Sequence, residues 1–152
     1  MARVAIVPIV MASGVAFALP ALAGPSAWKA GDLIPGTVKQ IYDGDGLWLE
    51  DGDGNPNTFL QIRLFGINAP EWNHFGGKEA KEFLVGRIKG QHVRCTVRDI
   101  DRKYSRPVSI CLDDAGNDLS CAIVWAGHAV VTNAKYVPCD RSKLPPPGPA
   151  PF

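Results

Sequence analysis

The sequence lacks an excess of charge of either sign once its first residues are set apart. The full chain of 152 residues carries 16 Lys and Arg against 15 Asp and Glu. Residues 1–23 contain Arg3 and no acidic residue, so 15 residues of each sign remain beyond them. A chain without net charge has no overall positive field to attract a polyanion. Any polyanionic ligand must therefore be bound by a few arginines placed at one site.

Beyond residue 23 the sequence also lacks an apolar run long enough to span a bilayer. One long apolar run occurs at the start, where uncharged residues follow Arg3 and end in Ala21-Leu22-Ala23. A basic residue, an apolar segment and a small-residue ending are typical of a secretory signal peptide. The alternative is a membrane anchor, which the breaks at Pro8 and Pro20 disfavour. We expect residues 1–23 to be cleaved near Ala23, leaving a periplasmic or secreted protein without membrane attachment.

Zinc-binding spacings are absent as well. The sequence has no C-x-x-C pair, and its three histidines are scattered. An even number of cysteines in a small exported domain indicates disulfides, and four cysteines allow three pairings. We favour Cys95–Cys111, because both residues lie in strand-like runs joined by a polar loop. This choice leaves Cys121–Cys139.

The remaining residues form one small domain between two irregular segments. Residues 24–35 are a lead-in with little pattern, and residues 36–137 hold the periodic patterns. The Pro-rich residues 138–152 are expected to be extended and disordered. No internal repeat occurs.

Hydrophobic periodicity predicts five strands and two helices. The strands are predicted over residues 37–42, 47–49, 58–66, 93–97 and 107–112. Apolar residues at helical spacing predict one helix that ends at Gly90 and a second from an Asp118 cap to Gly127. Three meander strands, a helix, two strands and a helix predict a mainly β fold with helices. The expected architecture is a five-stranded, partly closed barrel of the oligonucleotide/oligosaccharide-binding (OB) kind.

Three groups of polar residues occupy positions that packing alone does not require. In chain order the groups are Asp43 with Asp45; Arg63 with Asn68, Ala69 and Glu71; and Lys103 with Tyr104 and Arg106. Carboxylate, amide and carbonyl oxygens suit Ca²⁺, and planar guanidinium groups suit phosphate oxygens. A carboxylate beside a metal and a phosphate can take a proton from water. The combination indicates metal-assisted phosphodiester hydrolysis; the alternative is that Arg63 only snorkels and Glu71 is only solvated.

Three sequence blocks carry a family resemblance. Residues 41–45, 62–71 and 101–107 resemble the signature blocks of the staphylococcal nuclease family and occur in the family's order. The resemblance covers about residues 36–129. It implies a calcium-dependent nuclease on a five-stranded barrel that cuts DNA and RNA.

The same resemblance implies a role for each site residue. Asp45 is the metal carboxylate, Asn68 takes the second metal-ligand position, and Ala69 supplies a backbone carbonyl. Glu71 orients or deprotonates the attacking water, and Arg63 and Arg106 hold the phosphate and stabilise transition-state charge. The residues that contact a nucleotide phosphate are Lys103 and Tyr104. The expected protein is a monomer with a nucleic acid substrate and Ca²⁺ as cofactor.

Departures from the family pattern keep alternatives open. Asn68 stands where the family has aspartate, and Ser105 stands where it has glycine. The family's third helix is expected to be missing, because a proline tail follows Cys139. The first alternative is a catalytically weakened or inactive OB-fold module that binds nucleic acid. The second is a truncated product that does not fold stably.

Overall fold

The computed structural model describes residues 28–50, 59–132 and 139. Its elements are, in chain order, β1 (Leu33–Ile41), β2 (Gly46–Glu50), β3 (Phe59–Leu64), β4 (Ile67–Asn68), α1 (Gly77–Ile88), β5 (His92–Asp101), β6 (Arg106–Asp113), α2 (Leu119–Trp125) and β7 (Val130–Val131). The predicted signal peptide and, apart from Cys139, the predicted proline tail lie outside the described residues. Within them, no helix is long and apolar enough to cross a membrane.

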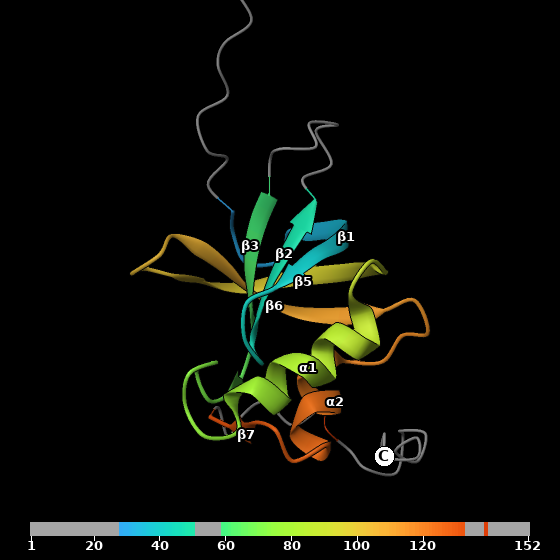
Figure 1. The fold of residues 1–152 in the computed structure, drawn as a ribbon. Helices are drawn as coiled ribbons and strands as arrows, with labels where there is room; N and C mark the ends of the chain where they lie inside the picture. Colours follow the sequence, from blue (N-terminus) through green and yellow to red (C-terminus); the bar gives the residue numbers. More distant parts are fainter. Residues whose placement is uncertain (1–27, 51–58, 133–138, 140–152) are drawn as a thin grey trace, which may run out of the picture.

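Five strands form a closed barrel in the order β1-β2-β3-β6-β5, and β5 pairs back onto β1. All pairs are antiparallel except β3 with β6, which run parallel. Both helices lie at one end of this barrel, where α1 contacts β1 and α2 contacts β6 (Figure 1). The predicted mainly β fold, a five-stranded barrel with two helices, is confirmed, and the described part of the chain contains no third helix.

The first strand begins earlier than the sequence predicts. Residues 33–37 pair with β5, whereas Val38 and the residues after a bulge pair with β2. This change of partner closes the barrel, and Pro35 lies in the half that pairs with β5 alone. The predicted lead-in therefore includes barrel residues. Its local sequence gave no sign of this, because the pairing partner lies far along the chain.

Alternation along the strands places most apolar side chains inside the barrel and most polar ones outside; Ser109 and Asp113 of β6 are buried exceptions. Ile62 and Leu64 are fully buried, and Arg63 between them faces outward. Cys95 and Cys111 lie directly opposite each other in the β5–β6 register and form a disulfide in the core. The second disulfide joins α2 to Cys139 through Cys121. Both pairings are those favoured from the sequence.

The helix boundaries follow the predicted signals. Asp118 caps α2, since its carboxylate accepts hydrogen bonds from the backbone N–H groups of Ser120 and Cys121 at 2.8 and 3.3 Å. Helix α1 ends just before Gly90, which has a φ of 79°.

The predicted third strand is too long. Strand β3 ends at Leu64, and a turn at Gly66 leads into β4, which pairs with β7. Two-residue strands such as β4 and β7 carry no periodicity that a sequence can reveal.

Candidate active site

The turn between β1 and β2 is seated on the helices through Gly44. A β-carbon at this position would lie 2.6 Å from the Ala69 β-carbon and 2.7 Å from that of Ala80 in α1. A β-carbon at Gly46 would likewise lie 2.8 Å from Oδ1 of Asp43. The two glycines therefore let the turn approach α1 and let the Asp43 carboxylate fold back over β2.

Asp45 is the buried centre of a hydrogen-bond network. Its Oδ1 accepts a hydrogen bond from Nη1 of Arg63 at 2.9 Å, and its Oδ2 accepts one from the backbone N–H of Ala69 at 3.1 Å. The other terminal nitrogen of Arg63, Nη2, donates to Oδ1 of Asn68 at 3.2 Å. Arg63 thus bridges two other predicted site residues, Asp45 and Asn68. The contact of Ala69 here is made by its N–H group, whereas the sequence predicts a role for its carbonyl.

Burial dominates the electrostatics of Asp45. Desolvation raises the pKa of its carboxyl group from 3.8 to about 6, although Arg63, the Ala69 N–H group and Arg106 all act to lower it. The neighbouring carboxylate of Asp43 also contributes to this rise. The cationic partners present therefore do not fully compensate the buried charge, and an additional cation would favour the ionised form.

The donor set around Asp45 fits a hard cation. The nearby oxygens are those of the Asp43 and Asp45 carboxylates and of the Asn68 amide, which are ligand types that Ca²⁺ takes. Those of Asp45 and Asn68 accept hydrogen bonds from Arg63 and from the Ala69 N–H group, which a bound cation would displace or share. The described residues contain no group of three or more His, Cys, Asp or Glu side chains that could hold a metal. A calcium site here would thus depend on amide and backbone oxygens in addition to carboxylates.

The β5–β6 hairpin, whose turn projects from the barrel in Figure 1, carries the third predicted group, Lys103 with Tyr104 and Arg106. Nε of Arg106 donates to Oδ2 of Asp101 at 3.0 Å, and its guanidinium carbon lies 5.0 Å from the Tyr104 ring centroid. Nζ of Lys103 lies 4.8 Å from the same centroid. Ser105 adopts a φ of 52°, so the serine occupies a backbone conformation that favours glycine.

Asp101 is a site residue that sequence reasoning did not single out. Burial raises the pKa of its carboxyl group, but hydrogen bonds from Arg106 and from the Lys103 and Tyr104 backbone outweigh that effect and lower it. The ionised carboxylate holds Arg106 from one side while Tyr104 packs on its guanidinium group. An acidic residue five positions before an arginine in a hairpin loop was the available signal.

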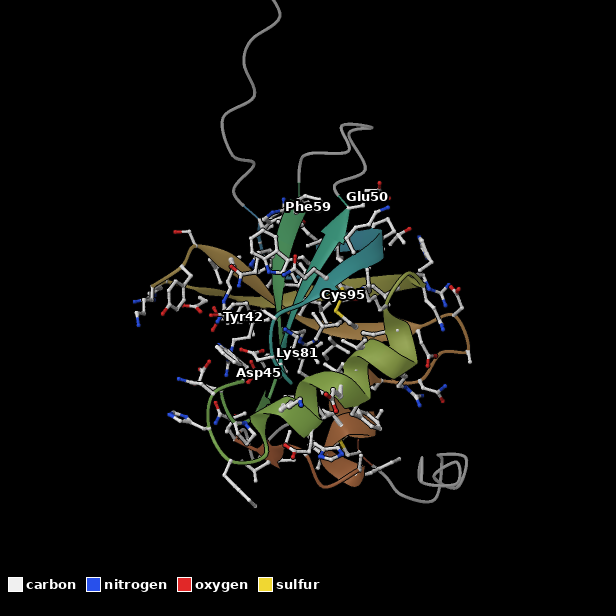
Figure 2. All side chains as sticks on the ribbon, in the orientation of Figure 1. Tyr42, Asp45, Glu50, Phe59, Lys81 and Cys95 are labelled. Carbon is white, nitrogen blue, oxygen red and sulfur yellow. A yellow bond between two sulfur atoms is a disulfide. The ribbon has the colours of Figure 1, made fainter. Side chains whose placement is uncertain are left out.

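The strand register of the barrel brings the hairpin residues to the same side of the barrel as Arg63 and its partners. Arg63 of β3 lies opposite Val108 of β6, and Arg106 precedes Val108 by two residues, so both arginines lie on the same outer face. The charge of Arg106 is one of the effects that lower the pKa of Asp45. The pKa of Lys103 is raised mainly by Tyr104, with smaller contributions from the charges of Asp101 and Glu71. The exposed Glu71 thus lies within electrostatic reach of the hairpin. Figure 2 shows Asp45 towards the helix end of the barrel, with Phe59 at the opposite end.

The family model described as "Staphylococcal nuclease homologue" matches residues 61–144, which is more than half of the chain. The chain belongs to the staphylococcal nuclease family. The match includes every predicted site residue except those of the β1–β2 turn. The family assignment made from the three sequence blocks is therefore confirmed.

Curated relatives of this nuclease-family chain carry endonuclease names. "Endonuclease Htp3" of Saprolegnia parasitica is 34% identical over 96 residues, which cover 52% of this chain and 44% of the relative. "Probable endonuclease LCL3" of Candida dubliniensis and of Candida tropicalis are each 35% identical over 85 residues, covering 50% of this chain and 36% of each relative. The chain thus spans less than half the length of the curated relatives it matches.

Proposed function

We propose that this protein is an exported, calcium-dependent nuclease that hydrolyses phosphodiester bonds of DNA and of RNA. The observation that carries the proposal is the placement of Arg63 and Arg106 on one outer face, both within reach of the buried Asp45. Family membership and the endonuclease names of the relatives support the same reaction. The protein is proposed to act as a monomer.

In this proposal the chain's residues divide into a base, a phosphate clamp and a strand-binding pair. Glu71 takes a proton from the attacking water. Arg63 and Arg106 bind the phosphate oxygens with planar guanidinium groups and stabilise the charge that develops in the transition state. The neighbouring phosphate is contacted by Lys103 and Tyr104.

Asp45, Asn68 and the Ala69 carbonyl would hold the proposed calcium ion, with Asp43 beside them. When bound, Ca²⁺ supplies Lewis-acid polarisation of a phosphoryl oxygen. The burial-raised pKa of Asp45 and the oxygen donor set support this position. Asn68 contributes an amide in place of a second charged ligand, so the expected calcium affinity is lower than that of a site with two carboxylates.

Two substitutions test the proposal on a single-stranded oligonucleotide with Ca²⁺. Glu71→Gln removes the base and Arg106→Ala removes one clamp, and each should lower kcat/KM by roughly 10²- to 10⁴-fold. Glu79→Gln and Arg102→Ala are matched controls, because both residues are exposed and lie outside the proposed site. The proposal predicts near-normal rates in both controls and an unchanged melting temperature for Glu71→Gln. Digestion at the wild-type rate by Glu71→Gln or Arg106→Ala would reject the assignment.

A second candidate is a module that binds nucleic acid without cleaving it. Asn68, which brings no charge to the site, is the observation that favours it. This candidate predicts binding of single-stranded DNA that is the same with Ca²⁺ and with chelator, and no products after prolonged incubation.

Export is the part of the proposal that rests on residues 1–23 alone. The apolar run and its small-residue ending support cleavage after Ala23. N-terminal sequencing of the protein recovered from the periplasm or medium of an expressing bacterium should give Gly24 as the first residue. Retention of Met1 on the exported protein would contradict the signal-peptide assignment.

A further inference from the structure

The loop between β4 and α1 exposes two large aromatic rings that the proposed mechanism does not use. Trp72 is 57% exposed and Phe75 is 103% exposed. Burial of an aromatic side chain of this size stabilises a protein, because it removes a large apolar area from water. Their exposure beside a candidate active site points to a ligand that covers them.

The backbone that carries these rings is fixed. The N–H of His74 donates to the Glu71 carbonyl at 2.8 Å, and the N–H of Gly77 donates to the His74 carbonyl at 3.0 Å. Gly77 packs so closely that a β-carbon there would lie 2.9 Å from Cα of Trp72 and would overlap the Glu71 carbonyl group. The rings are therefore presented from a preorganised loop, which lowers the entropy lost when a ligand binds.

The loop adjoins groups that bind phosphate but cannot recognise a base. Trp72 directly follows Glu71, whose charge reaches Lys103 on the hairpin. Arginine and lysine hold a phosphate backbone without reading its bases, whereas aromatic faces stack on any unpaired base. We propose that Trp72 and Phe75 form a nucleobase-stacking platform for single-stranded substrate next to the active site; this inference rests on the proposed nuclease function.

The platform favours unpaired strands for a structural reason. Bases in a duplex already stack on one another, so only a base that has left the helix can lie on an exposed ring. A protein partner is a poorer match, because a stable protein interface buries on the order of 1,200 Å² or more and this patch consists of two rings.

Binding to a fluorescein-labelled single-stranded oligonucleotide tests the platform, measured by anisotropy in the Glu71→Gln background so that no cleavage occurs. Trp72→Leu and Phe75→Leu should each weaken binding by roughly fivefold or more, given stacking energies of this class. Phe59→Leu is the matched control, because Phe59 is 44% exposed at the opposite end of the barrel (Figure 2). Its affinity should match that of the background protein.

Salt dependence separates stacking from charge. Trp72→Leu should leave the slope of log affinity against log salt unchanged, whereas Lys103→Ala should reduce its magnitude by about 0.7. Cleavage is measured in the background that retains Glu71. There, Trp72→Leu should lower kcat/KM for single-stranded DNA and leave kcat/KM for duplex DNA unchanged.

The outcomes distinguish this inference from the proposed function. A wild-type protein that cleaves nothing refutes the nuclease proposal, while the anisotropy series still decides the platform. Wild-type cleavage together with unchanged affinity in both loop variants overturns the platform alone. Concentration-dependent dimerisation that Trp72→Leu abolishes would assign the rings to self-association and would likewise overturn it.

Discussion

At the residue scale, Asp45 has an environment that disfavours its own charge. Asp45 is 2% exposed, and Arg63 pairs with its carboxylate from the neighbouring strand. The pair nevertheless leaves the pKa of Asp45 at about 6, well above the 3.8 of a solvated carboxyl group. A protein that keeps such a carboxylate ionised at neutral pH does so at a cost in stability, which bound Ca²⁺ would offset.

This pKa predicts how the stability of the calcium-free protein changes with pH. The folded state binds more protons than the unfolded state between about pH 4 and pH 6, so the free energy of unfolding contributed by Asp45 falls as pH rises through this window. The expected loss is on the order of 3 kcal/mol. Asp45→Asn cannot ionise and should not show it.

Urea unfolding in chelator at pH 4 and pH 7 measures this difference. The free energy of unfolding of Asp45→Asn, taken relative to wild type, should be higher at pH 7 than at pH 4. Comparison with wild type removes the contribution of Asp101 and Asp113, whose lowered pKa values act in the opposite direction. A relative stability that stays constant across this range would show that Asp45 has an ordinary pKa.

At the element scale, the junction between the Glu71 loop and α1 depends on one glycine. Any side chain at Gly77 must displace the Glu71 backbone, whereas a β-carbon at Gly86, in the same helix, meets nothing within 4 Å. Gly77→Ala should therefore lower kcat, by about tenfold or more, because small displacements of a base are costly. Gly86→Ala should leave kcat unchanged and raise stability by up to about 1 kcal/mol.

Steady-state kinetics and thermal melts of both variants check this prediction. A positioning role predicts a fall in kcat with little change in KM, since Arg63 on β3 and Arg106 on β6, which form the phosphate clamp, are untouched. Equal kcat values in Gly77→Ala and Gly86→Ala would show that the loop tolerates the shift.

The elements that could be predicted are those whose signals are local. Helix α2 follows from its Asp118 cap, and β6 and the first half of β5 follow from alternation. The second half of β5, beyond the bulge after Val97, does not alternate and was not predicted. The start of β1 and the short β4–β7 pair could not be predicted, because distant partners define them. The resemblance places glycine at the position of Ser105, and the φ of 52° shows that the turn keeps a backbone conformation that favours glycine although its residue is serine.

At the scale of the whole molecule, the candidate site depends on one long-range pairing. Sequence blocks identified its residues, but the parallel contact of β3 with β6 places Arg63 and Arg106 on one face. The hydrogen bond from Arg63 to Asp45 and the approach of Gly44 to α1 arise only in the folded chain. No local pattern encodes such distances, so the sequence predicts the participants and the fold supplies their arrangement.

The most direct test of this arrangement is a double-mutant cycle on the two arginines. Arg63→Lys and Arg106→Lys keep both charges and remove the planar forks, so each should lower kcat/KM for a single-stranded oligonucleotide by roughly 10²-fold. If both forks bind one phosphate, the double variant should lose clearly less than the product of the two single effects. A loss equal to that product would show that the arginines act at separate places, and would contradict a single active site on this face of the barrel.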